Sequence, residues 1–287
     1  VRVGIVGAGP WVKGAHAPVF AAGPETTLHA VWARRPEAAA AIADRYGATV
    51  AGSLDELADV SDVVVFAVPP AVQAELASRV ARRSRPLLLE KPLAEDLAGA
   101  ERLAEAVADA GVATMVTLSW RYSEGVRRFL DEASSFGATG GWGQFVSGAL
   151  LGGPYATPWR LEKGALLDLG PHVLDLLDAA LGPVTAVRAA GDSLRWLALT
   201  LEHEGGAVSQ ASLSASVPLS PHRAGVELFG PGGGLGVDCV ATVGPEAFTT
   251  LRREVAAMAR GAGPHPLDIS RGLHLQRILE EAARQLA

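Results

Sequence analysis

Short apolar runs alternate with amphipathic segments along the first 118 residues. The densest run, residues 63–68, is short and β-branched, which is typical of a buried strand. Strands and helices that alternate at this spacing predict a parallel, doubly wound sheet. The expected strands are residues 2–7, 28–33, 62–68, 86–90 and 112–118. The expected helices run from the glycine turn to about residue 22, over 36–46, after a Ser53/Glu56 capping box, over 71–83 and over 94–110.

The pattern changes after about residue 119. We expect a helix over 123–134, a glycine-rich turn over 137–143, an irregular segment over 144–163 and a helix that ends at residue 181. Apolar and polar residues alternate over 208–213, which predicts an antiparallel sheet with one covered face. The expected strands are 184–190, 195–202, 207–216, 224–229 and 235–240, followed by helices over 246–260 and 268–286.

The predicted fold class is therefore α/β, with two domains. Residues 1–119 form an N-terminal Rossmann domain with a doubly wound parallel sheet. Residues 120–287 form a C-terminal α+β domain with an open, mainly antiparallel sheet. A chain of 287 residues is long enough for two domains of ordinary size.

Composition excludes several classes of protein. A net charge of -6 argues against binding to nucleic acid, and no run approaches the roughly 18 apolar residues of a membrane span. We recognise no signal peptide, and Cys239 is the only cysteine, so no internal disulfide forms. We expect Cys239 to be a small buried residue, the protein to be cytoplasmic, and no metal to be bound, because no ligand cluster has suitable spacing.

The glycine turn Gly7-Ala8-Gly9 follows a predicted strand and opens a predicted helix, as in a dinucleotide-binding loop. Gly7 permits the tight turn, and Gly9 allows the backbone to approach a pyrophosphate at the helix N-terminus. The third glycine of the motif is replaced by Val12. The alternative is a glycine turn that binds nothing. The expected cofactor-binding residues are Gly7, Gly9, Pro10, Trp11, Ala33, Arg34, Arg35, Val68, Pro69, Pro70, Glu90 and Lys91.

The residues at the end of the second predicted strand indicate whether the cofactor is NAD or NADP. An acidic residue at this point grips the ribose 2′-hydroxyl of NAD. The chain has Ala33 there, followed by Arg34 and Arg35. Two guanidinium groups suit a 2′-phosphate, which favours NADP, with NAD as the alternative. Otherwise the arginines belong to an exposed loop and helix start.

Lys91 invites a chemical explanation because the chain uses 22 arginines and only three lysines. Lysine is a compact hydrogen-bond donor whose protonation can be tuned, whereas arginine stays charged. Lys91 follows Glu90 at the carboxyl end of a buried strand, the edge at which ligands of doubly wound sheets bind. A Glu90–Lys91 ion pair that caps the strand is the structural alternative.

A second constellation lies in the C-terminal half, where Asp168 precedes His172 by four residues. Pro171 favours the first helical position, which places His172 in the first turn of the helix. The helix dipole there favours a neutral imidazole that accepts a proton. A carboxylate nearby, from Asp168 or Asp175, can orient the imidazole for general acid–base catalysis. Asp175 otherwise serves as a first-turn acid that complements the dipole.

Taken together and in this order, Gly7-Ala8-Gly9, Glu90-Lys91-Pro92 and Asp168-x-Gly170-x-His172-x-x-Asp175 resemble the glucose–fructose oxidoreductase/inositol dehydrogenase/MocA (Gfo/Idh/MocA) family over essentially the whole chain. The resemblance implies oxidation or reduction of sugars, polyols and related carbonyl compounds with NAD(P). It also implies catalytic roles for Lys91, Asp168 and His172. An open sheet commonly forms the oligomer interface in that family, so we expect a homodimer or homotetramer. The chain departs from the pattern at Val12, at Gln73, where the family often has histidine, and in its short second domain.

Our leading hypothesis is an NADP-dependent dehydrogenase or reductase for a small hydroxy or carbonyl compound. His172 accepts the proton of the substrate hydroxyl, Lys91 hydrogen-bonds the same oxygen, and Asp168 orients His172 or binds a neighbouring hydroxyl. One alternative is a non-catalytic, cofactor-sensing regulatory protein, and another is a reductase of an imine or an unsaturated ring. Candidates for substrate contact, each with a structural role as its alternative, are Tyr122, Trp159, Arg160 and Asp175.

Overall fold

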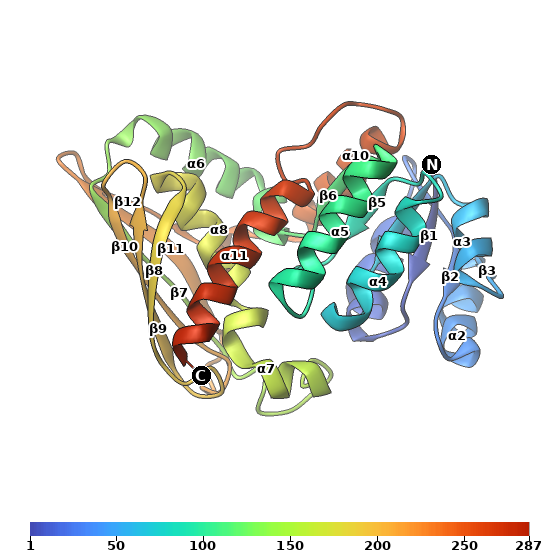
Figure 1. Ribbon diagram of the computed structural model, residues 1–287, viewed down its shortest axis with the longest axis horizontal. Coiled ribbons are helices and arrows are strands. Elements are labelled where there is room, and N and C mark those ends of the chain that lie inside the picture. The colour runs from blue at the N-terminus through green and yellow to red at the C-terminus, as the bar shows by residue number, and fades with distance from the viewer. Residues whose placement is uncertain (287) are drawn as a thin grey trace. The chain divides into compact units, whose positions relative to one another are not determined.

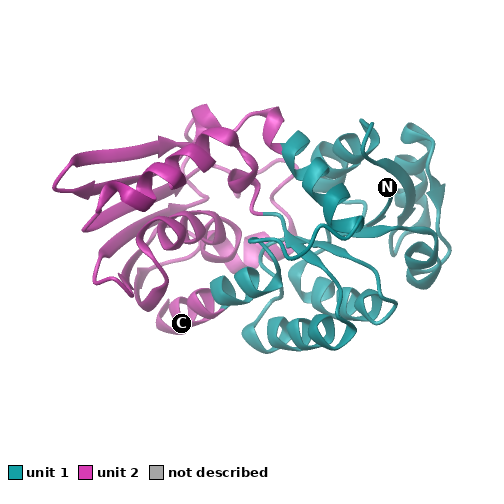
Figure 2. Ribbon diagram, turned by 90° about the horizontal axis from the view of Figure 1, so that it is seen from above, with its two compact units in different colours: residues 1–117, 248–276 teal, residues 118–247, 277–287 magenta. Residues whose placement is uncertain are grey.

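The computed structural model describes residues 1–286, which form two compact units (Figure 2). Unit 1 comprises Val1–Thr117 and Phe248–Gln276. Unit 2 comprises Leu118–Ala247 and the chain from Arg277 onward. Each unit is described by itself below.

Unit 1 contains the predicted doubly wound sheet (Figure 1). Its six strands are all parallel and lie in the order β3-β2-β1-β4-β5-β6. The chain first winds from β1 outward to β3 and then returns to β4 on the other side of β1, so the winding reverses between β1 and β4. Ligands of open parallel sheets bind at the carboxyl ends of such a pair of strands. The strands are β1 (Arg2–Val6), β2 (Thr27–Trp32), β3 (Thr49–Val50), β4 (Val63–Phe66), β5 (Leu87–Leu89) and β6 (Thr114–Val116).

Local signals in the sequence set the helix ends of unit 1. Ser53 accepts a hydrogen bond from the backbone N–H of Glu56, as the predicted capping box requires, and Gly47 and Gly111 end their helices in the left-handed conformation. The last helix before β6 begins three residues later than expected because Asp96 caps it. The elements are the π-helical turn η1 (Val12–His16), α1 (Ala17–Ala21), α2 (Pro36–Tyr46), α3 (Leu54–Val60), α4 (Pro70–Ala81) and α5 (Leu97–Ala110).

The chain returns to unit 1 near its C-terminus, so the division at residues 119 and 120 differs from the structure. Helix α10 (Pro245–Ala259) is joined to unit 1 by Arg252, whose Nε lies 2.9 Å from Oε2 of Glu25. The backbone N–H of Val116 donates to the carbonyl of Leu267 at 2.7 Å. These contacts connect residues far apart in the sequence, and no local pattern marks them. Helix α11 (Ile269–Leu286) begins in unit 1 and ends in unit 2.

Unit 2 is built on a six-stranded sheet in the order β12-β11-β7-β10-β9-β8. Its strand pairs are antiparallel except for β7 and β10, which are parallel, so the sheet is mixed and mainly antiparallel, as expected. The strands are β7 (Gly140–Val146), β8 (Val184–Gly191), β9 (Leu197–His203), β10 (Val208–Ser214), β11 (Arg223–Gly230) and β12 (Gly233–Asp238). The helical elements are η2 (Ser119–Tyr122), α6 (Glu124–Phe136), α7 (Pro158–Asp168), α8 (Gly170–Leu181) and α9 (Cys239–Thr242).

Strand β7 corrects the sequence prediction, which placed a turn over 137–143 and irregular chain after it. Its glycines allow close packing inside the sheet. A Cβ on Gly143 would lie 2.6 Å from Cγ1 of Val173 in α8, and a Cβ on Gly141 would lie 2.7 Å from the carbonyl of Glu227 in β11. Glycine inside a strand marks this kind of close approach. The segment predicted to be irregular likewise contains helix α7.

Cys239 is buried, as predicted, at the start of α9. Burial, with a smaller contribution from the charge of Asp238, raises the pKa of its thiol to about 12. The side chain therefore remains a neutral thiol at ordinary pH. Across residues 1–286, none of the helices combines the length and the apolar character that crossing a bilayer requires.

Candidate active site

The glycine loop lies at the carboxyl end of β1, where the winding of the sheet reverses. Gly7 has φ of 122°, and a Cβ on it would lie 2.4 Å from the carbonyl oxygen of Ala67, directly after β4. The N–H of Gly7 donates to the carbonyl of Trp32 at the end of β2. Only glycine fits this position, because any side chain would meet the backbone of the neighbouring strand.

Gly9 has a different reason to be glycine. A Cβ at this position would meet no atom of the chain within 4 Å, and its φ lies outside the left-handed region. The space in front of Gly9 is therefore open on the side where a pyrophosphate would approach the backbone. Val12, in place of the third glycine, is fully buried. The loop residues thus fit a dinucleotide, with a valine at the third position of the motif.

Arg34 and Arg35 follow β2, beside the glycine loop, and both side chains are exposed. Within residues 1–286, no carboxylate forms an ion pair with either guanidinium. Arg35 also occupies the N-cap position of α2 with extended backbone. Two exposed cations at the end of β2 are compatible with an anionic ligand, and a role in binding one stays a prediction.

The carboxyl end of β5 carries Glu90 and Lys91, both half-buried. Oε1 of Glu90 accepts hydrogen bonds from Nε1 of Trp11 at 2.8 Å and from Nε2 of His16 at 2.7 Å. The Glu90 carboxylate thus joins the strand that precedes Lys91 to the helix that follows the glycine loop. His16 is completely buried, and nothing in the sequence marked it as a site residue, because a lone histidine on a helix carries no signal of its own.

In unit 2, His172 lies in the first turn of α8, as Pro171 predicted. Its imidazole stacks on the indole of Trp120, with ring centroids 5.0 Å apart, and also contacts the ring of Phe145. Only 8% of its surface is exposed. The aromatic neighbours restrict the orientation of the ring. Neither Trp120 nor Phe145 was among the predicted site residues.

Asp168 is the last residue of α7, and its Oδ1 lies 3.0 Å from Nε of Arg160. The Arg160 guanidinium lies over the ring of Trp159, 4.6 Å from its centroid. The structure thus brings together three residues that the sequence proposed separately. Tyr155 adds a second aromatic ring 6.0 Å from the same guanidinium.

The other two candidates for substrate contact, Asp175 and Tyr122, are both buried. Asp175 is 1% exposed, and both of its carboxylate oxygens lie 3.1 Å from Nη1 of Arg121. Tyr122 is also 1% exposed. The Arg121–Asp175 pair joins η2 to α8. Asp175 lies beyond the first turn of α8, which holds no acidic residue, so the alternative of a first-turn acid that complements the dipole is wrong. A role of either residue in substrate binding remains a prediction.

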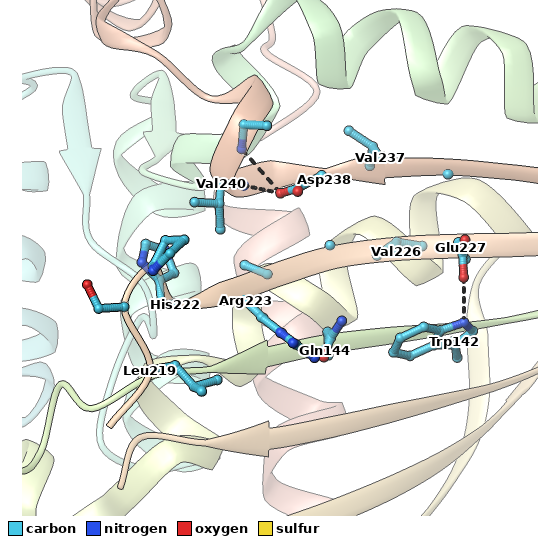
Figure 3. A pocket seen from close by; sticks show the side chains of 16 residues that line it. Trp142, Gln144, Leu219, His222, Arg223, Val226, Glu227, Val237, Asp238 and Val240 are labelled. Carbon is cyan, nitrogen blue, oxygen red and sulfur yellow. Dashed lines mark hydrogen bonds between the residues drawn. The ribbon is translucent and has the colours of Figure 1, made fainter. Parts of the chain in front are cut away.

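A hollow of about 910 Å³ lies on the open face of the unit 2 sheet, over β7, β11 and β12 (Figure 3). Trp142 donates from Nε1 to Oε2 of Glu227 across two of these strands. None of the predicted catalytic residues lines the hollow. It is therefore a feature of the exposed sheet face, separate from the proposed chemistry.

These features define a dinucleotide-binding Rossmann unit joined to a unit with an open sheet, and comparison with known proteins agrees. Residues 1–118 match the family model described as "Oxidoreductase family, NAD-binding Rossmann fold", and residues 137–235 match the GFO/IDH/MocA C-terminal domain. The chain belongs to the GFO/IDH/MocA oxidoreductase family. The predictions of family, fold class and a dinucleotide-binding domain are confirmed.

The relatives include a reductase of a dTDP-linked deoxysugar, a levoglucosan dehydrogenase and an inositol 2-dehydrogenase. A dTDP-3,4-didehydro-2,6-dideoxy-alpha-D-glucose 3-reductase of Streptomyces violaceoruber is 29% identical over 196 residues, which cover 66% of this chain and 57% of that protein. Levoglucosan dehydrogenase of Pseudarthrobacter phenanthrenivorans is 29% identical over 217 residues, which cover 66% and 53%. The match spans little more than half the length of these relatives.

Solved structures share the fold over the whole chain. The crystal structure of GenD2 from gentamicin A biosynthesis, in complex with NAD, has a TM-score of 0.88 and 24% sequence identity. The match covers 100% of this chain and 94% of that chain. At this identity the similarity is one of fold.

Proposed function

We propose that this protein is an NADP-dependent dehydrogenase or reductase that interconverts a hydroxyl and a carbonyl group on a sugar, polyol or related compound. The observation that carries the proposal is the position of Lys91. It lies two residues after the end of β5, at the same edge of the parallel sheet as the glycine loop. The activities of the named relatives, which act on a dTDP-linked deoxysugar and on levoglucosan, support this class of substrate.

In this proposal the side chains of the protein position the substrate and transfer its proton. The nicotinamide, when bound, would exchange a hydride with the substrate carbon. His172 accepts the proton of the substrate hydroxyl, and the stacking on Trp120 limits the directions in which it can do so. Lys91 donates a hydrogen bond to the same oxygen and stabilises negative charge that develops there. Asp168, whose carboxylate is held by Arg160, orients His172 or binds a neighbouring hydroxyl.

Turnover measurements test the proposal. The purified protein is assayed at 340 nm with NADP(H) and NAD(H) against nucleotide-linked deoxysugars and their keto forms, anhydrosugars, inositols and free sugars. We expect turnover with at least one of these compounds. Tight binding of the cofactor without turnover of any compound would contradict the proposal that the protein is an enzyme. It would favour a cofactor-sensing protein.

The preference for NADP is a finer proposal that depends on Arg34 and Arg35. Because a charge-assisted hydrogen bond contributes about 1.5–3 kcal/mol, changing both to alanine should raise the Kd for NADPH roughly 10- to 150-fold. The Kd for NADH should change little. Arg45→Ala, in the last turn of α2, is the matched control and should leave both values unchanged. Isothermal titration of each variant decides the point, and tighter binding of NADH than NADPH by the unmodified protein would refute the preference.

We also propose that the open face of the unit 2 sheet joins copies of the chain into a dimer or tetramer. Trp142, Val208 and Phe229 are large apolar residues exposed on strands of this sheet. Trp142→Glu should dissociate the assembly in sedimentation velocity, because a carboxylate would be placed inside the interface. Leu161→Glu, at a somewhat more exposed position on α7, is the control and should leave the assembly intact. An unmodified protein that sediments as a monomer would overturn the proposal.

A further inference from the structure

Gln73 is a completely buried polar residue in α4 that the proposed mechanism does not use. Its side-chain amide faces the segment after β5. Oε1 accepts a hydrogen bond from the backbone N–H of Glu90 at 2.9 Å, and Nε2 donates to the carbonyl of Glu90 at 2.7 Å. The amide of Gln73 therefore pairs with the backbone of Glu90 on both sides, as a neighbouring strand would.

The same amide also reaches beyond Lys91. Nε2 donates to the carbonyl of Leu93 at 3.0 Å and approaches that of Pro92 at 3.3 Å. A primary amide has two N–H groups and one carbonyl, and all three are engaged here. Gln73 thus holds the backbone immediately before Lys91 and the backbone immediately after it.

The side chain of Glu90 fixes this segment from another direction. Its carboxylate accepts hydrogen bonds from Trp11 and His16, so Glu90 is held through its backbone by α4 and through its side chain by the helix after the glycine loop. Two independent attachments define the path of the chain through Lys91.

We propose that Gln73 is a positioning residue for Lys91. Its amide fixes residues 90–93, and the ammonium group is thereby held at the carboxyl edge of the sheet. The inference rests on the role given to Lys91 in the proposed function. Removing the amide would leave buried backbone donors and acceptors unpaired, and the segment would have to rearrange to satisfy them. A residue that only filled space could be replaced by an apolar side chain of similar size without moving Lys91.

The first test reads the position of Lys91 without any turnover. The chain has only three lysines, Lys13, Lys91 and Lys163, so reductive methylation with ¹³C-formaldehyde gives few NMR signals. Loss of a signal in Lys91→Arg assigns Lys91. In Gln73→Met we expect the Lys91 signal to shift, while those of Lys13 and Lys163 stay in place. Val80→Ala removes buried methyl groups two turns farther along α4 and should move none of the three.

An unmoved Lys91 signal in folded Gln73→Met would overturn the proposal, as would an equal shift in Val80→Ala. If Gln73→Met fails to fold, Gln73→Glu takes its place, because it keeps the length and the acceptor for Glu90 but loses both N–H groups. An unmoved Lys91 signal in Gln73→Glu, or an equal shift in Val80→Ala, would then overturn the proposal.

The second test uses turnover. Gln73→Met should lower kcat by about tenfold or more, because a small misplacement of a reacting group greatly slows the reaction. In a Lys91→Met background the same change should have no further effect on kcat, since Gln73 acts through Lys91. Additive losses would contradict the proposal. If the unmodified protein has no turnover at all, the proposed function fails, but the NMR measurement still decides whether Gln73 positions Lys91.

Discussion

Replacing His172 with alanine is expected to lower kcat/KM by about 10²- to 10⁴-fold, the range that a positioned general base contributes. Lys91→Met should cause a loss in the same range, because a donor to the developing negative charge is removed. Steady-state kinetics on the best substrate from the turnover assay measures both. The binding of NADPH to His172→Ala should change little, since His172 is not among the expected cofactor-binding residues.

The control for this prediction is His29→Ala. His29 is a half-buried histidine in β2 to which the proposed mechanism gives no role. It should keep kcat/KM within about threefold of the unmodified value. Full activity of His172→Ala or of Lys91→Met would show that the assigned chemistry is wrong, even if the cofactor is bound as proposed.

The second large effect concerns Gly9. Gly9→Ala should raise the Kd for NADPH about 5- to 150-fold, because an added methyl group in a close contact costs about 1–3 kcal/mol. The melting temperature without cofactor should not change, since the new Cβ meets no atom of the chain within 4 Å. Isothermal titration and differential scanning calorimetry measure the two quantities.

Gly205→Ala is the matched control for Gly9→Ala. Gly205 lies in the turn between β9 and β10, also without positive φ and without any atom within 4 Å of the added Cβ. It should alter neither the Kd nor the melting temperature. Unchanged affinity in Gly9→Ala would mean that the cofactor does not approach the backbone there. A lower melting temperature would mean that Gly9 serves the fold.

The sequence was sufficient to predict most of residues 1–117 of unit 1, apart from the short edge strand β3, because the signals there are local. A β-branched run marks β4, Ser53 with Glu56 marks the start of α3, and Gly47 marks the end of α2. The glycine loop was predicted for the same reason, since strand, turn and helix follow one another directly along the chain.

Strand β7 shows where sequence reasoning fails. Gly140, Gly141 and Gly143 resemble a turn when only their neighbours in sequence are considered. Their small size is required by Val208, Glu227 and Val173, which come from three distant segments. The return of residues 248–276 to unit 1 was missed for the same reason, because it depends on contacts such as that between Arg252 and Glu25.

The same distinction between local signals and distant contacts applies to the candidate site. Lys91 and His172 could be proposed from the sequence because each stands in a motif with its own local geometry. The residues that hold them were not found. His16 and Gln73 reach Glu90 from 74 and 17 residues away, and Trp120 stacks on His172 across a comparable distance in the chain. Gln73 was noted in the sequence only as a departure from the family pattern, and the structure supplies its contacts.

The most direct test of the proposed function follows the hydrogen atom itself. A keto substrate is reduced with NADPH that carries deuterium on one face of C4 of the nicotinamide, and the product is analysed by mass spectrometry. We expect one of the two labelled cofactors to give product that is one mass unit heavier, and the other to give unlabelled product. Product that carries no label from either cofactor, or labelled product formed equally well by Lys91→Met, would contradict the account.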